Sequence, residues 1–219
     1  AVPNTQLSSS ARPILLLNNA QGIFRDMSSA RALPAAVITR APVLLDCDGD
    51  RDLDVFYGNI GTNGIWLNDG AGNFRLDRRR LPVSTEPTSA AAVADIDGDG
   101  DLDLAFSSGD LSGAATVVLR NAGGFFSPVA RVPAQAEVSS RLVWLDIDGD
   151  RDLDLIFANV DYVSAFPEPM VVWQNDGVAG FSTAPATVLP PGGFDTFDVA
   201  VADVDTDGRL DLIVGDWRS

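Results

Sequence analysis

The stretch DIDGDGDLD, residues 95–103, places an aspartate at every second position. Three other stretches share its pattern: DCDGDRDLD at 46–54, DIDGDRDLD at 146–154 and DVDTDGRLD at 203–211. Two carboxylates about 4 Å apart repel each other by roughly 4 kcal/mol at an effective dielectric constant of about 20. Whatever holds one such cluster together must therefore act four times in this chain.

The clusters are the most regular part of a longer repeat, since they begin 49, 51 and 57 residues apart. Such a period is typical of propeller blades or solenoid units. Each cluster lies between two short apolar runs, as AAVA (91–94) and LDLAFSS (102–108) show for the second. An apolar stretch then ends in a turn and an aromatic residue, as in IWLNDGAGNF (65–74). Because Asn-Asp-Gly between apolar runs is a hairpin signal, each unit predicts about four short strands.

These units predict an all-β fold, since no segment shows sustained helical periodicity. We expect a single β-propeller domain, residues 1–219, of about four blades, each a four-stranded antiparallel sheet. The expected repeat units are residues 43–91, 92–141, 142–198 and 199–219, the last completed by residues 11–28. The segment ILLLNNAQGIF (14–24) matches the last two strands of a unit, and pairing it with the last cluster would remove exposed sheet edges. A fragment of a larger propeller, or half of one completed by a second chain, remains an alternative.

Each cluster also has the composition of a cation site when its residues are numbered from the first aspartate. Carboxylates recur at positions 1, 3, 5 and 9: Asp46, Asp48, Asp50, Asp54; Asp95, Asp97, Asp99, Asp103; Asp146, Asp148, Asp150, Asp154; and Asp203, Asp205, Asp207, Asp211. Position 7 is Asp52, Asp101, Asp152 or Arg209. Because an arginine is accepted at position 7, its backbone carbonyl is the expected ligand there.

Oxygen ligands in a tight loop, without nitrogen or sulfur, are typical of calcium, and we predict about four Ca²⁺ ions. Magnesium is less suitable because it retains several waters. An EF-hand would need a glutamate at position 12 and flanking helices, whereas the four residues there are Tyr57, Phe106, Phe157 and Val214. Glycine is common at positions 4 and 6, so Arg51 and Arg151 at position 6 predict slight strain.

The composition excludes several classes of function. The net charge is −16, which argues against nucleic acid and anionic membranes as partners. No apolar run is long enough to insert into a membrane. The chain has no His and no Lys, so Ser-His-Asp catalysis and Schiff-base chemistry are excluded. The single cysteine, Cys47, is interpreted as a small buried residue.

The pattern D-x-D-x-D-G-x-x-D-L, followed by L-x-N-D-G-x-G-x-F, resembles the FG-GAP/VCBS repeats of integrin-type β-propellers. This resemblance implies structural calcium bound by positions 1, 3, 5 and 9 and by the carbonyl at position 7. It also implies a secreted protein, extracellular or periplasmic, that acts in adhesion, carbohydrate binding or assembly. Many members have seven or eight blades, so four blades would be a departure.

We therefore expect a non-catalytic interaction module with a protein or carbohydrate partner, or a subunit of a larger assembly. Exposed aromatic residues are expected in the loops 159–170 (Tyr162, Phe166) and 189–198 (Phe194, Phe197). The run Arg78–Arg80 favours a solvated turn over contact with an acidic partner or with the chain's own Asp-rich surface. The alternative function is a scaffold or fragment of a calcium-dependent polysaccharide lyase or glycosidase. A glycosidase needs two carboxylates across a cleft, and no such pair is evident outside the clusters.

Overall fold

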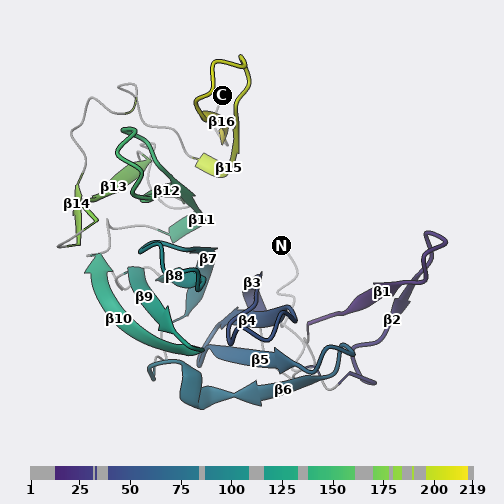
Figure 1. The fold of residues 1–219 in the computed structure, drawn as a ribbon. Helices are drawn as coiled ribbons and strands as arrows, with labels where there is room; N and C mark the ends of the chain where they lie inside the picture. The colour runs from purple at the N-terminus through teal and green to yellow at the C-terminus, as the bar shows by residue number, and fades with distance from the viewer. Residues whose placement is uncertain are drawn as a thin grey trace, which may run out of the picture.

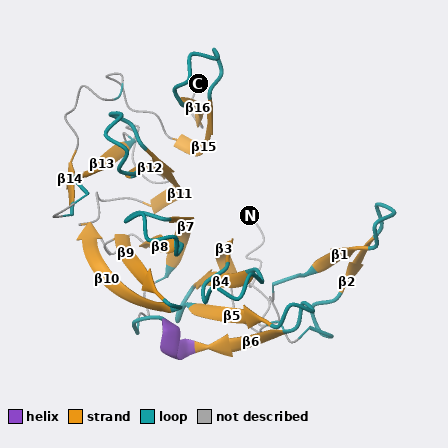
Figure 2. Cartoon of the chain, viewed as in Figure 1, coloured by secondary structure: helices purple, strands orange, loops and turns teal. Residues whose placement is uncertain are grey.

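The computed structural model describes residues 13–31, 33, 39–83, 87–108, 116–132, 138–160, 170–177, 180–183, 189 and 196–216. Figure 2 shows that these residues form strands and loops, with one short 3-10 helix at Arg78–Arg80. The predicted all-β class is confirmed.

Three four-stranded antiparallel sheets account for most of the chain. The first contains β3 (Thr39–Leu45), β4 (Asp54–Asn59), β5 (Gly64–Asn68) and β6 (Phe74–Asp77). The second contains β7 (Thr88–Ala94), β8 (Asp103–Ser108), β9 (Thr116–Ala122) and β10 (Phe125–Val132). The third contains β11 (Val138–Leu145), β12 (Asp154–Val160), β13 (Val171–Asn175) and β14 (Phe181–Thr183). In each sheet the strands follow one another in chain order, as consecutive hairpins require.

The sheets pack face to face, so the second strand of each is covered on both sides. All six residues of β4 are buried, which explains why this strand is apolar on both faces. Between the first and second sheets the Phe56 and Phe106 rings stack at 5.7 Å between centroids. Leu142 and Leu155 pack against Ala105 between the second and third sheets.

The first strands of the sheets, β3, β7 and β11, contact one another in sequence, and β11 also contacts β15 (Thr196–Ala202). Figure 1 shows the sheets succeeding one another along an arc, with these first strands on its inner side. Since each sheet contacts the next along the chain, residues of successive units share a core, and Leu45 and Leu104 lie in one buried cluster.

The ends of the described chain form two separate half-sheets. β1 (Leu16–Asn18) pairs with β2 (Phe24–Asp26), and β15 pairs with β16 (Asp211–Asp216). The expected composite blade, residues 199–219 completed by 11–28, is therefore not formed, and no sheet of the described residues closes a ring. The N-terminal hairpin is instead attached near the first sheet, where Phe74 N–H donates to the Arg31 carbonyl at 3.0 Å. Figure 1 places it at the opposite end of the arc from β15 and β16.

A bulge recurs in the first strand of all four units and was not predicted from the sequence. The strand register shifts at Arg40, Ser89, Ser140 and Phe197, each six residues before an aspartate cluster. A bulge increases local twist and bends its strand. The repeat is therefore also a repeat of backbone geometry, and it sets how each strand enters its aspartate loop.

Candidate metal sites

Each aspartate cluster forms the loop between the first and second strands of a unit. All four loops fold on the same hydrogen bonds. The carboxylate at position 1 accepts the N–H of position 6, as Asp95 does from Gly100 at 3.0 Å and Asp203 from Gly208 at 3.0 Å. The carboxylate at position 5 accepts the N–H of position 7, as Asp99 does from Asp101 at 2.9 Å. These bonds turn the backbone back on itself and direct several carboxylates toward one point.

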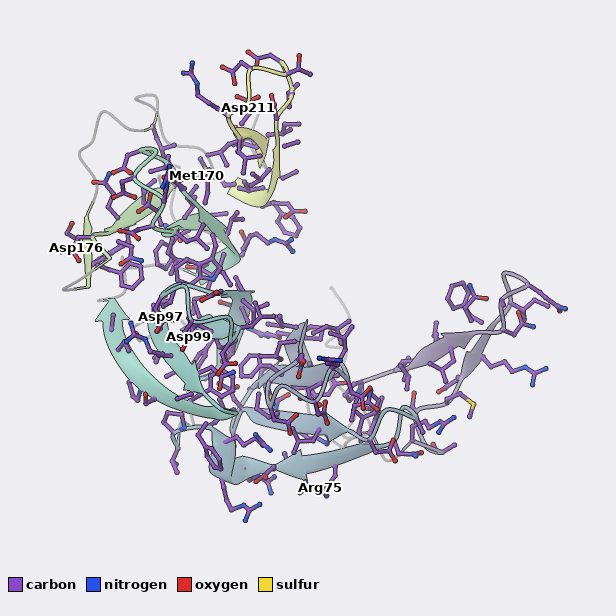
Figure 3. All side chains as sticks on the ribbon, viewed as in Figure 1. Arg75, Asp97, Asp99, Met170, Asp176 and Asp211 are labelled. Carbon is purple, nitrogen blue, oxygen red and sulfur yellow. The ribbon has the colours of Figure 1, made fainter. Side chains whose placement is uncertain are left out.

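The loops bring together groups of carboxylates that could hold a metal ion. In each group one oxygen per residue lies within 4.8 Å of the others. The groups are Asp46, Asp48 and Asp50; Asp95, Asp97 and Asp99; Asp146, Asp148 and Asp154; and Asp203, Asp205 and Asp211, with Cys47 also near Asp48 and Asp54. Figure 3 labels Asp97 and Asp99 in the second loop and Asp211 at the fourth. Positions 1 and 3 recur in all four of these carboxylate groups, whereas position 5 completes the first two groups and position 9 the last two.

The aspartate at position 9 is a structural residue in addition to a candidate ligand. Asp54, Asp103 and Asp154 are completely buried. Asp103 accepts two backbone N–H bonds, from Ile96 at 2.9 Å and from Asn121 at 2.7 Å. Burial raises the pKa of Asp103 to about 6, although these two hydrogen bonds act in the opposite direction. In the three complete sheets, the position 9 carboxylate thus links the start of its loop to the third strand of the same sheet.

The asparagine at the end of the third strand completes this arrangement and was missed from the sequence. The N–H groups of Asn68, Asn121 and Asn175 each donate to the position 9 carboxylate of their own sheet, at 2.7–2.8 Å. The Asn121 side chain also donates to the Cys47 carbonyl in the first loop, at 3.0 Å. The asparagine at the end of each apolar run, as in IWLN (65–68) and VVLRN (117–121), was a signal that could have identified them.

The carboxylate at position 7 lies against the turn between the third and fourth strands. Asp101 accepts the Gly123 N–H at 3.0 Å, and a Cβ at Gly70 would lie 2.5 Å from an Asp52 oxygen. None of the candidate metal sites among the described residues includes a position 7 carboxylate.

One buried oxygen in the first loop fits a bound cation. Asp48 Oδ1 is fully buried and has no hydrogen-bond partner among the described residues. Burial and the nearby carboxylates of Asp50 and Asp54 raise the pKa of Asp48. A buried carboxylate oxygen without a donor is costly, and a hard cation is the partner that the other oxygens of this loop would share with it.

The position 3 carboxylates differ in their neighbours. Arg80 NH2 lies 3.0 Å from Asp48 Oδ2, and Arg120 Nε lies 2.7 Å from Asp97 Oδ2. In the third loop the neutral Gln174 amide donates to Asp148 at 2.9 Å. No ion pair to Asp205 of the fourth loop is found within the described residues.

The arginine run forms the expected solvated turn only in part, because Arg78 and Arg79 are exposed whereas Arg80 is not. Arg80 is largely buried, donates to the Gly124 carbonyl at 2.9 Å and lies over the Phe125 ring. With its bond to Asp48, it links the first sheet to the second and contacts the chain's own Asp-rich loop. Arg79 hydrogen-bonds the Asp77 carboxylate, which lowers the pKa of Asp77 to about 2.

Two other predictions from the sequence can be compared with the structure. Cys47 is buried as predicted, and burial raises the pKa of its thiol, so the thiol stays protonated. Phe197 is 52% exposed, as expected, but it lies at the bulge of β15 and not in a loop. Tyr162, Phe166 and Phe194 lie outside the described residues.

The two arginines at position 6 have the strained backbone that the sequence predicts. Arg51 has φ of 74° and Arg151 has φ of 82°, where the other two loops have glycine. A left-handed conformation costs a residue with a Cβ roughly 1–2 kcal/mol. Replacing that residue by glycine removes this cost, but the larger conformational entropy of glycine in the unfolded chain offsets part of the gain in stability. We therefore expect Arg51→Gly and Arg151→Gly each to stabilise the chain by about 0.5–1 kcal/mol in urea unfolding. Arg75→Gly, in an exposed position of β6, is the matched control and should lower stability.

Among the described residues, no helix is long and apolar enough to span a membrane. A search of curated proteins found no match. Among solved structures, the chain is similar to the crystal structure of the V. cholerae biofilm matrix protein Bap1, with 13% sequence identity and a TM-score of 0.49. The similarity covers 84% of this chain and 29% of that chain. The FG-GAP-like repeat family matches residues 46–106 and 159–214, more than half of the sequence. The first matched segment contains the first two aspartate loops and the second contains the fourth. The chain therefore belongs to the FG-GAP-like repeat family.

Proposed function

We propose that the chain is a non-catalytic interaction module that is stabilised by about four calcium ions and acts outside the cytoplasm. The observation that carries the proposal is the set of four loops that share one fold and gather carboxylate oxygens within 4.8 Å. One such loop could be a solvated acidic turn, but four in the same position of four units, one with an unpartnered buried oxygen, favour a bound cation. Membership of the FG-GAP-like repeats supports calcium.

In each proposed site, the carboxylates at positions 1, 3, 5 and 9 and the carbonyl at position 7 would hold the ion. The position 7 side chain lies against a neighbouring turn, so a ligand at this position would be its carbonyl. Extracellular calcium is millimolar and would fill even weak sites of this type. Four ions would change the formal charge from −16 to about −8.

We further propose that the sheets are blades of a propeller-type arrangement. Support comes from their meander topology, their face-to-face packing and the contacts between successive first strands. Partner binding would then fall to loops at the rims of the blades, because the faces between successive complete sheets are buried. The partner class is a protein or a carbohydrate, since the charge opposes nucleic acid.

Native mass spectrometry in calcium, in magnesium and after chelation tests the metal proposal. About four calcium ions per chain are expected, with weaker or no retention of magnesium. Asp99→Ala should remove one ion, and Asp69→Ala, a matched aspartate in the β5–β6 turn, should remove none. A calcium-loaded chain should then bind a partner in a screen of glycans and extracellular proteins. Turnover of a polysaccharide would favour the enzyme alternative, and absence of bound calcium would contradict the metal proposal.

A further inference from the structure

The two half-sheets expose surfaces that are buried in every complete sheet. The second and third strands of the first sheet, β4 and β5, are buried almost throughout. The corresponding strands of the half-sheets are β16, which is partly exposed, and β1, which is fully exposed. We propose that β1 of one copy of this chain pairs with β16 of a second copy, giving a four-stranded sheet in the order β15-β16-β1-β2. This inference uses strand geometry and does not depend on bound calcium.

The three complete sheets fix the register of this pairing. In each, the residue after the position 9 aspartate pairs with the residue two before the asparagine of the third strand, as Val55 pairs with Trp66. Leu104 with Leu119 and Leu155 with Trp173 follow the same rule. In the half-sheets the rule aligns three apolar pairs: Leu212 with Leu16, Ile213 with Leu15 and Val214 with Ile14. The two strands are thus complementary in hydrophobicity as well as in register.

In the three complete sheets, the asparagine N–H of the third strand donates to the position 9 carboxylate. The half-sheets contain both the corresponding donor and the corresponding acceptor. Asp211 Oδ2 accepts the Val204 N–H at 2.8 Å, as the other position 9 carboxylates do from their own loops. Asp211 Oδ1 has no donor among the described residues, whereas the corresponding oxygen of Asp103 accepts from Asn121. Asn18 ends β1 at the place of Asn121, so the proposed pairing would bring its N–H to Asp211 Oδ1.

A second, independent correspondence links the fourth loop to the N-terminal hairpin. In the first and third sheets the turn residue facing the position 7 carboxylate is glycine, because a Cβ there would collide with Asp52 or Asp152. In the fourth loop position 7 is Arg209, and the corresponding turn residue of the hairpin is Ala20. Ala20 has φ of 65°, close to the 74° of Gly70, so it keeps the same turn despite its Cβ. The turn tolerates a Cβ in the one hairpin whose proposed partner lacks the position 7 carboxylate.

The proposed partner of β16 is β1 of a second copy, because the N-terminal hairpin of the same chain is attached to the first sheet. Phe74 N–H of the first sheet donates to the Arg31 carbonyl at 3.0 Å, and the Arg31 side chain donates to Asn73 at 2.9 Å. Figure 1 shows the hairpin directed away from β16, at the other end of the arc. A second copy could pair without breaking these contacts. About a twofold axis, β16 of each copy could pair with β1 of the other.

Cysteine cross-linking tests the partner and the register together. Residues directly opposite in an antiparallel pair have Cα atoms about 4.5–5.5 Å apart, within disulfide range. In a Cys47→Ala background, Leu16→Cys with Leu212→Cys should form a covalent dimer on mild oxidation, with and without calcium. Leu17→Cys with Leu212→Cys, one residue out of register, is the control and should remain largely uncross-linked. A disulfide within one chain, or no disulfide at all, would overturn the proposal.

Sedimentation velocity gives a second measurement that does not rely on cysteine chemistry. Ile213 is 54% exposed, but its counterparts Phe56 and Ile156 are completely buried. Ile213→Lys is therefore expected to abolish the dimer and leave the circular dichroism spectrum unchanged. Ile60→Lys, at a residue 41% exposed outside the proposed interface, should retain the dimer. An Ile213→Lys chain that still sediments as a dimer, or an unaltered chain that sediments as a monomer at high concentration, would contradict the inference.

Discussion

Chelation of calcium is expected to lower the melting temperature of this chain by roughly 20 °C or more. A ligand at 100 times its dissociation constant stabilises the folded state by about 2.7 kcal/mol per site, so four independent sites would contribute about 10 kcal/mol. For a chain of 150–250 residues, each kcal/mol shifts the melting temperature by about 2–4 °C. The physical cause is the mutual repulsion of the loop carboxylates once the cation is removed.

Thermal unfolding followed by circular dichroism, in millimolar calcium and in excess EGTA, measures this shift. Magnesium at the same concentration is the control for ionic strength and divalent charge, and it should restore only part of the stability, because it binds such loops poorly. Equal melting temperatures in calcium and EGTA would contradict the proposed structural role of the ion.

Asp103→Ala is expected to cost about 2–6 kcal/mol of unfolding free energy, and the loss should persist in EGTA. The substitution leaves the N–H groups of Ile96 and Asn121 buried without an acceptor, at about 1–3 kcal/mol each. Asp99→Ala in the same loop is the matched variant, since Asp99 is exposed and is proposed to act mainly through the ion. Its cost should be clear in calcium and nearly absent in EGTA.

Urea unfolding of both variants in the two conditions separates the two roles. The informative quantity is the change in each variant's cost when calcium is removed. If Asp103→Ala became harmless in EGTA, the buried carboxylate would act only as a ligand, and its hydrogen bonds would contribute little to the fold.

The strands and their order could be predicted because each unit repeats its apolar runs and turn residues at nearly constant spacing. The Asn-Asp-Gly turn at 68–70 gave the β5–β6 hairpin directly. The roles of Asn121 and Arg80 could not be predicted in this way. Asn121 acts on a carboxylate 18 residues earlier in its own sheet and on a carbonyl 74 residues earlier in the first loop. The second partner becomes a neighbour only when two sheets stack.

The expected composite blade was wrong for the same kind of reason. Sequence complementarity between residues 14–24 and the last unit shows which strands can pair, but it does not show whether they belong to one chain or two. That depends on the angle between successive sheets, which side-chain packing sets. The four bulges, likewise, were invisible because the residues at the bulge, such as Arg40 and Ser140, have no common side chain.

The unequal neighbours of the position 3 carboxylates have a consequence for how the chain responds to its surroundings. A guanidinium beside Asp48 or Asp97 must share that carboxylate with an incoming divalent ion, which opposes binding in the first two loops. Asp148 has the neutral Gln174 amide beside it, and no arginine pairs with it among the described residues. As ambient calcium rises, the C-terminal half would become rigid first, while the N-terminal half still exchanges its arginine contacts. The rigidity of the chain would then vary along its arc. The calcium concentration, and not the order of the strands, would set this variation.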